Sequence, residues 1–467
     1  MAKKTIQNNN ILQYNRNSSD FFNTEYKEWA KSVIEERALP SVIDGFKPTQ
    51  RKVVHAANIG SLKDGKLYKL LALSGDSMKL SLYSHGDMSL NSVIVNLCKD
   101  FEDNFNPLES DSQVGTLRDP DSAGSPRYLY VKQSKWMNII YKTDYNLLDF
   151  VFDEGQYVEP EYYLPIIPTV LTKNNIGVAV GYAMHNISRN PIDVIDACIE
   201  YIKTHDITIR IKPYIRGIDN INWYFNDTEN KWYCKGMWKY NMSKDKMSVI
   251  DLPYDMTYES FEKLLNKLED NNFIKSWTNL STCDGIDYEI QFNKGELIKK
   301  AKSDKTGLQL PSKFKLIKQV PDDLLWLLDE NKKLTYFNTV YSVIKYFIKF
   351  RLNIYNKRKK QTTEYLEKKY KDNSNLVRFI ELVSTDKLVI KNRSKSDIKI
   401  EMENNYNLPV SLLSTPMSLL TEEEKQKLLK ENDQIKSDLD YIKNTTVEDM
   451  YLNDLKELKK QLKSEFK

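Results

Sequence analysis

Residues 37–58 read RALPSVIDGFKPTQRKVVHAAN, and this stretch places a turn between two helical segments. Pro40 ends the first segment, because proline lacks a backbone N–H and has a fixed φ. The run 44–48 is a turn signal, and its proline stands at the first position of a new helix. We therefore predict a helix over Thr49–Asn58. Its polar face would carry Arg51, Lys52 and His55, and its core face Val53, Val54 and Ala57.

Basic side chains gather around this predicted helix. Between residues 47 and 69 the chain has six lysines or arginines and one acid, although its formal net charge is only +4. A helix, a turn and a basic helix are typical of a helix-turn-helix DNA reader, and the local charge predicts a phosphate-facing patch. A solvated helix face is the alternative. Upstream, a helix is expected from Thr24, with Tyr26, Trp29, Ala30, Val33 and Ile34 on one face.

His85 lies in the loop Tyr83–Asp87, just before a predicted helix over Ser89–Phe101. An exposed loop at a helix N-terminus suits a phosphate contact. A structural role is the alternative interpretation for a single histidine.

Residues 115–130, GTLRDPDSAGSPRYLY, contain the pair Arg127-Tyr128. A phenol with a pKa of about 10 attacks a phosphodiester only if cations stabilise the phenolate and the phosphate. The neighbouring arginine supplies one such cation. Packing is the alternative role for any one of the 29 tyrosines.

From about residue 151 to 334 the pattern is mixed α+β. Strands are predicted over 207–211, 232–234 and 247–250, and a helix over 260–268. The segment Ile176–Gly181 is expected either to be a buried strand or to present Val178 to DNA as an apolar wedge.

The C-terminal part predicts long helices. Residues 322–408 contain neither Gly nor Pro, and apolar residues from Phe337 to Tyr355 recur at helical spacing. Thr421 begins a second helix with a capping box. We expect an antiparallel coiled coil with a small globular knob at about 373–408.

Length and cysteines set the general class. A chain of 467 residues exceeds one domain of about 100–200 residues. Its four cysteines are far apart and form no CxxC pair, which argues against a disulfide framework and fits a reduced intracellular compartment. No signal peptide and no membrane span is expected. Residues 1–23 are expected to form a flexible arm.

Six stretches, in order, resemble one family, the DNA breakage–reunion subunit of type IIA topoisomerases (the A-subunits of gyrase and topoisomerase IV). The medium subunits of tailed-phage type II topoisomerases are the most similar in build. The stretches are RALP (37–40) with DGFKPTQRK (44–52), SHGD (84–87), GT (115–116) with RYLY (127–130), YLPIIP (163–168), GVAVG (177–181) and SLLT (418–421).

The resemblance implies an α+β multidomain fold. A flexible arm (1–23) would precede a winged-helix catalytic domain (24–150), a mixed α/β tower domain (151–335) and a coiled coil (336–467) that carries the exit gate at 373–408. It also implies roles. Tyr128 would be the nucleophile that joins the DNA 5′ end, and Arg127, His85 and Arg37 would support the phosphate. Contacts to DNA would come from Lys47, Arg51, Lys52 and Val178.

The resemblance further implies a homodimer on double-stranded DNA that needs a partner subunit. The family holds Mg²⁺ on a separate acidic domain. Asp119-Pro120-Asp121 has the spacing of a metal motif but follows no hydrophobic strand, so we expect no metal site in this chain. No phosphate-binding Walker motif is present, so ATP would also be bound by the partner. We expect relaxation and decatenation of DNA in the cytoplasm, that of the host if a phage encodes the chain.

Two other interpretations stay open. The chain could be a non-catalytic winged-helix scaffold on DNA, or it could cleave DNA without a metal and without a partner. The acidity of residues 99–121 has no explanation in the sequence.

Overall fold

The computed structural model of the chain describes residues 17–466, apart from 283–284, 305, 322–323, 391–392 and 417–420. The chain divides into two compact units, Met1–Phe347 with Leu462–Lys467, and Ile348–Gln461. No helix in these described ranges has both the length and the apolarity needed to cross a membrane. The predicted flexible arm lies mostly outside the described residues, but residues 18–23 are helical, so the arm was predicted too long at its C-terminal end.

The N-terminal helical stretch consists of α1 (Ser18–Phe21), η1 (Phe22–Tyr26), α2 (Lys27–Val33) and η2 (Ile34–Ala38). It ends two residues before Pro40, as predicted. The residues predicted to share one face differ in burial. Ile34 is buried, but Trp29 is 56% exposed and Tyr26 37% exposed. Ring contacts instead link Phe22, Tyr26 and Trp29 along the exposed surface of this stretch.

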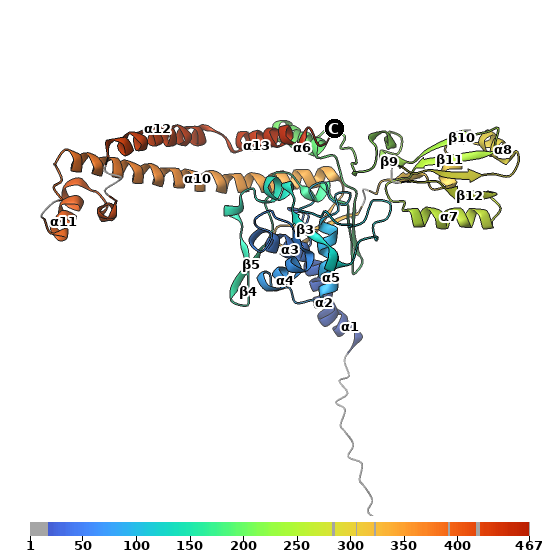
Figure 1. The fold of residues 1–467 in the computed structure, drawn as a ribbon, viewed down its shortest axis with the longest axis horizontal. Coiled ribbons are helices and arrows are strands. Elements are labelled where there is room, and N and C mark those ends of the chain that lie inside the picture. The colour runs from blue at the N-terminus through green and yellow to red at the C-terminus, as the bar shows by residue number, and fades with distance from the viewer. Residues whose placement is uncertain are drawn as a thin grey trace, which may run out of the picture. The chain divides into compact units, whose positions relative to one another are not determined.

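Three helices and a small sheet follow in the first unit (Figure 1). The helices are α3 (Pro48–Ile59), α4 (Leu70–Leu80) and α5 (Asp87–Leu97). The antiparallel sheet has the order β1-β3-β2, with β1 (Tyr68–Lys69), β2 (Leu108–Glu109) and β3 (Tyr130–Gln133). Pro48 begins α3 as predicted, and the backbone N–H of Lys47 donates to Gln50 Oε1 at 3.0 Å.

The predicted polar face of α3 is wrong at two positions. His55 is only 4% exposed and Arg51 only 7% exposed, so α3 is buried on most of its circumference. His55 packs edge-on against Phe150 at 5.9 Å between ring centroids. Burial, and secondarily Lys52, lowers the pKa of His55 from 6.5 to about 4, so the imidazole is neutral at pH 7.

The rest of the first unit is built on a hairpin, three sheets and flanking helices. The hairpin is β4 (Phe150–Asp153) with β5 (Gln156–Pro160). One sheet has the order β16-β15-β7-β6, with β6 (Asn175–Ala179), β7 (Tyr182–Asn186), β15 (Leu324–Leu328) and β16 (Leu334–Phe337). A second has the order β14-β9-β8, with β8 (Trp223–Asn226), β9 (Lys231–Lys235) and β14 (Ile317–Gln319). The third has the order β10-β11-β13-β12, with β10 (Met237–Asn241), β11 (Lys246–Asp251), β12 (Ser276–Asn279) and β13 (Tyr288–Gln291).

The flanking helices are α6 (Pro191–Thr204), α7 (Tyr258–Asp270), α8 (Glu296–Ser303) and α9 (Gln309–Lys313). The predictions for 232–234, 247–250 and 260–268 are confirmed by β9, β11 and α7. The strand predicted over 207–211 is wrong. The amides of Thr208 and Ile209 donate to the Glu200 carboxylate of α6 at 2.9 and 3.2 Å, so this segment pairs with a side chain rather than with another strand.

The second unit is helical. It contains most of α10 (Val340–Ser384), α11 (Lys395–Tyr406), α12 (Glu422–Asn444) and most of α13 (Val447–Leu462). Ion pairs Lys369–Glu431 and Glu367–Lys443 show that α10 and α12 run antiparallel. Half of the expected capping box is present, since Thr421 accepts from the Glu424 amide at 3.4 Å, whereas the Glu424 carboxylate lies 3.5 Å from Lys427. Residues 418–420 of SLLT lie outside the described ranges. A small core holds α11 against the end of α10 and includes Phe379, Leu382, Ile398, Met402 and Leu408.

Candidate functional site

Tyr128 ends the one-turn 3₁₀ helix η3 (Pro126–Tyr128). Its side chain is 71% exposed, whereas the following Leu129 is 2% exposed. The Leu129 carbonyl accepts from the Leu70 amide at 2.9 Å, and the chain then enters β3. The Arg127 guanidinium carbon lies 6.0 Å from the centre of the Tyr128 ring. An accessible phenol with a cation beside it therefore projects from a turn that is fixed on its C-terminal side.

The loop before Tyr128 is held by its own hydrogen bonds. The Thr116 amide donates to Asp119 O at 3.0 Å, and the Gly124 amide donates to Gln113 O at 3.0 Å. Gly115 has φ +99°, and a Cβ there would lie 2.5 Å from the Pro120 carbonyl oxygen, so only glycine fits. Hydrogen bonds between its own residues therefore fix the conformation of the loop 113–124.

Four of the seven acidic side chains in residues 99–121 lie within 4 Å of a cation of the same unit, and Asp100 beside Arg216 is one of them. Asp103 pairs with Lys173 at 3.3 Å, and both side chains are buried. Lys132 lies 3.5 Å from Asp111 and 3.8 Å from Glu109. These ion pairs attach the acidic segment to other parts of the first unit.

Lys47 lies at the N-terminus of α3 and donates from Nζ to the Ile176 carbonyl at 3.0 Å. Partial burial lowers the pKa of Lys47. The ammonium lines a cavity of about 420 Å³ that also includes Ile176 and Asp121. The structure thus brings Lys47, strand β6 and the loop that leads to Tyr128 to one groove.

Strand β6 alternates between buried and exposed side chains. Val178 is 74% exposed and Ile176 is 64% exposed, so the interpretation as a fully buried strand is wrong. Gly177 faces the chain at η2, where a Cβ would lie 2.5 Å from the Ala38 carbonyl oxygen. Arg37, the residue before Ala38, is exposed. The sequence analysis does not single out Ile176, although the period of two in a strand places it on the same face as Val178.

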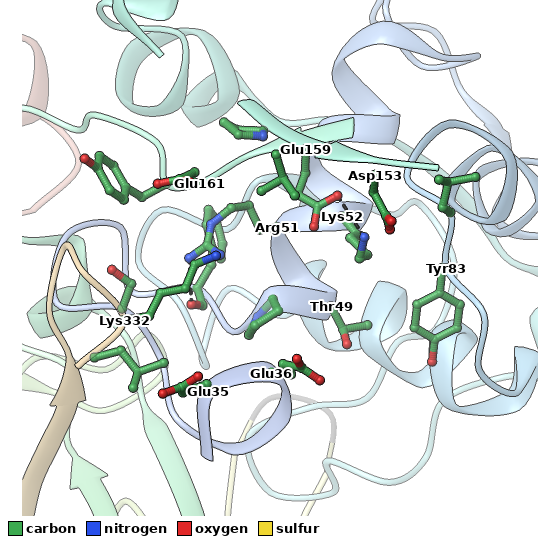
Figure 2. A pocket seen from close by; sticks show the side chains of 18 of the residues that line it. Glu35, Glu36, Thr49, Arg51, Lys52, Tyr83, Asp153, Glu159, Glu161 and Lys332 are labelled. Atoms are coloured by element: carbon green, nitrogen blue, oxygen red, sulfur yellow. Dashed lines mark hydrogen bonds and ion pairs between the residues drawn. The ribbon is translucent and has the colours of Figure 1, made fainter. Parts of the chain in front are cut away.

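Arg51 and Lys52 are not presented to solvent as the sequence predicts. Arg51 is buried against Asp44. Lys52 donates from Nζ to the Ser81 carbonyl at 2.7 Å and to Glu159 at 2.9 Å. Figure 2 shows the pocket they share, of about 460 Å³, in which carboxylates of η2 and of the β4–β5 hairpin outnumber the cations. Because Arg51 is buried and paired with Asp44, a direct DNA contact by Arg51 does not fit its placement.

His85 is exposed in the loop before Gly86, which caps the N-terminus of α5. Its ring lies 5.5 Å from that of Tyr83, in an edge-to-face arrangement. The predicted exposed position is confirmed. Within the described residues, no hydrogen bond, ion pair or ring contact joins Tyr128 to His85, Arg37 or Lys47.

The described part of the chain has no group of three or more His, Cys, Asp or Glu side chains arranged to hold a metal ion. Asp119 forms a turn with Thr116, and Asp121 lines the groove of Lys47.

The chain is similar to known proteins over most of its length. The family model for the DNA gyrase/topoisomerase IV A-subunit matches residues 37–460. The DNA topoisomerase medium subunit of Enterobacteria phage T4 is 26% identical over 453 residues, which cover 95% of this chain and 99% of that subunit. The mitochondrial DNA topoisomerase 2 of Dictyostelium discoideum is 29% identical over 391 residues, which cover 82% of this chain and 29% of that protein.

Among solved structures, the Plasmodium falciparum topoisomerase II DNA-binding, cleavage and re-ligation domain matches with a TM-score of 0.80 and 26% identity. The match covers 95% of this chain and 64% of that one. The chain therefore spans nearly the whole phage subunit but less than a third of the Dictyostelium protein.

Proposed function

The chain belongs to the DNA gyrase/topoisomerase IV A-subunit family, and on this basis we propose that it is the DNA-cleaving and DNA-rejoining subunit of an ATP-dependent type II topoisomerase. The observation that carries the proposal is the exposed Tyr128 beside Arg127, on a turn anchored through Leu129. The finer fold is part of the proposal. The α3–α5 helices with the β1-β3-β2 sheet would be a winged helix, residues 151–335 a tower, and α10 with α12 and α13 a coiled coil whose α11 knob is an exit gate.

The proposed reaction exchanges one phosphoester for another. The Tyr128 Oη attacks the scissile phosphate, an Oη–P bond forms, and the bond from phosphorus to the 3′ oxygen breaks. The 3′ oxygen leaves with a proton, and the 5′ end stays on the tyrosine. Arg127 stabilises the negative charge that grows on the phosphate. Attack by the 3′ hydroxyl reverses the step, so resealing uses no ATP.

We propose that DNA lies along the groove of Lys47 and β6. The Lys47 ammonium contacts a phosphate, and the exposed apolar pair Ile176 and Val178 inserts as a wedge that bends the duplex. His85 and Arg37 contact phosphate from their exposed positions. Lys52, which Glu159 holds, supports the site from the adjacent pocket.

The assembly we propose is a homodimer that works with a partner subunit. Two copies of Tyr128 cut opposite strands of one duplex, and a second duplex passes through the gap. Mg²⁺ and ATP would come from the partner subunit, as the resemblance to the family implies. We propose that the enzyme relaxes and decatenates DNA in the cytoplasm, that of the host for a phage-encoded chain, since one relative is a phage subunit.

A cleavage assay tests the proposal. The chain is incubated with supercoiled DNA, Mg²⁺ and a candidate partner subunit, and the reaction is stopped with detergent. Protein-linked linear DNA is expected, and Tyr128→Phe should abolish it. Tyr157→Phe, which removes a hydroxyl from another exposed tyrosine, should not change it. If none of the proteins cuts DNA but all retard it in a gel, the non-catalytic scaffold is correct. Cleavage without a partner would instead support the partner-independent enzyme.

A further inference from the structure

Arg118 belongs to the loop of Tyr128 but is bound to a different part of the first unit. Its side chain is 8% exposed. Nη1 donates to the Pro253 carbonyl at 2.6 Å and to the Met256 carbonyl at 3.2 Å. Nη2 donates to the Leu252 carbonyl at 2.5 Å and to Asp251 Oδ1 at 2.8 Å. One guanidinium therefore holds the whole connection between β11 and α7.

The backbone around Arg118 adds to this attachment. The Tyr258 amide, at the start of α7, donates to the Arg118 carbonyl at 3.0 Å. Leu117 packs against the apolar cluster that includes Trp223. Asp251 is itself fixed, because its second oxygen accepts from Asn222 Nδ2 at 2.5 Å.

A short path leads from Arg118 to Tyr128. Arg118 lies inside the turn that Thr116 and Asp119 close by mutual backbone hydrogen bonds of 3.0 and 3.1 Å. The Pro120 carbonyl oxygen would lie 2.5 Å from a Cβ at Gly115, so these two residues approach closely, and the Gly124 amide donates to Gln113 O on the same loop. Any displacement of Arg118 therefore reaches the residues directly before η3.

We propose that Arg118 is a positioning residue for Tyr128, because it fixes the loop of the nucleophile to the β11–α7 connection. This inference rests on the proposed function. It predicts that the sheet β10-β11-β13-β12 and the nucleophile move as one body. An arginine suits this role because its planar guanidinium can donate hydrogen bonds to four acceptors at once. A lysine ammonium has only three N–H donors, and their directions are not fixed in a plane.

The first test needs only this chain. Amide hydrogen exchange is measured on the full chain for wild type, Arg118→Ala, Arg118→Lys and Arg358→Ala. The last variant removes an Arg–Asp pair in the second unit, the pair with Asp454. In Arg118→Ala we expect exchange at Asp119 and Gly124 to rise by about 10-fold, since their hydrogen bonds lose support. Arg118→Lys, which keeps the charge and is the safer variant for folding, should give a smaller rise. No rise in either Arg118 variant, or an equal rise in Arg358→Ala, overturns the proposal.

The second test separates positioning from folding or DNA binding. In the reconstituted enzyme, Arg118→Ala should lower the rate of DNA cleavage by about 100-fold, the cost of a displacement of roughly 1 Å at a reacting group. Its affinity for DNA should stay within about twofold of wild type, since Arg118 is buried and makes no phosphate contact. Arg118→Lys should recover part of the rate. Equal losses of cleavage and affinity overturn the proposal. If wild type does not cleave, the proposed function fails, and the exchange data still decide whether Arg118 fixes the loop.

Discussion

Arg51 and Asp44 form a buried two-point ion pair, with Nε 2.8 Å from Oδ2 and Nη2 3.0 Å from Oδ1. The same carboxylate accepts from the Phe46 amide and from the Tyr163 amide, each at 3.0 Å. The pair therefore closes the turn before α3 and ties it to a segment far along the chain. Arg51, which the sequence suggests as a DNA contact, therefore has a structural role in the interior of the first unit.

The first prediction concerns this pair. Arg51→Ala should lower the free energy of unfolding by about 3–5 kcal/mol, because it leaves the Asp44 charge buried and unpaired. Urea unfolding measures the loss. At a temperature where the variant is folded, the salt dependence of DNA affinity should match wild type. A reduced salt slope with unchanged stability would instead make Arg51 a phosphate contact.

The second prediction is a pH dependence of stability through His55. Its pKa is about 4 in the folded chain and about 6.5 when unfolded, so the unfolded state binds more protons between these values. The stabilisation is complete above about pH 6.5 and is lost as the pH falls towards 4. His55 contributes at most about 3 kcal/mol to the free energy of unfolding through this pKa difference.

Unfolding curves at pH 7.5 and pH 5 measure this effect. In His55→Gln, the free energy of unfolding should differ less between the two pH values than it does in wild type. His205→Asn is the control, since His205 is an exposed residue with positive φ, which asparagine tolerates. An unchanged pH difference in His55→Gln would show that other groups cause it.

The third prediction concerns Lys47. If its ammonium contacts a phosphate, Lys47→Ala should reduce the slope of log affinity against log salt by about 1, and should do so for every DNA sequence. Fluorescence anisotropy at several salt concentrations gives the slope. Lys436→Ala, an exposed lysine of the second unit, should leave it unchanged. Equal slopes for Lys47→Ala and wild type would remove Lys47 from the DNA interface.

The fourth prediction concerns the wedge. Val178→Ala should weaken the bent complex by about 10-fold, since it removes about two buried methyl groups at roughly 0.8 kcal/mol each. Ile176→Ala should act in the same direction, and the double variant should be the weakest. Energy transfer between dyes on the two ends of a duplex reports the bend. Leu280→Ala, an exposed apolar residue elsewhere in the first unit, is the control. Bending that is normal in the double variant would contradict the wedge.

Local signals in the sequence correctly predict where several helices begin and where an exposed loop lies. Pro48 marks the start of α3, and Thr421 marks the start of α12, because caps and prolines act within a few residues. The exposed loop of His85 follows from the same kind of signal. Ile176 and Val178 are two positions apart in β6 and so lie on the same face of the strand. The period of two therefore predicts an exposed Ile176 as well.

Side-chain partners that the local pattern does not reveal explain what the sequence did not predict. Arg51 and Lys52 look like a solvent-facing pair, but Lys52 meets Glu159, which is 107 positions away. Residues 207–211 alternate like a strand, but their amides meet Glu200 on a helix. Arg118 binds residues 133–138 positions further along. Neither hydropathy nor spacing carries information about such contacts.

The most direct test of the central claim is to identify the residue that becomes attached to DNA. The chain is incubated with a partner subunit, Mg²⁺ and a duplex labelled with ³²P near the cut, and the complex is trapped with detergent. After nuclease and protease digestion, mass spectrometry locates the phosphorylated residue. We predict phosphate on Tyr128, attached to the 5′ end of the cut strand. Phosphate on another residue, attachment to the 3′ end, or cleavage with no covalent product would contradict the account.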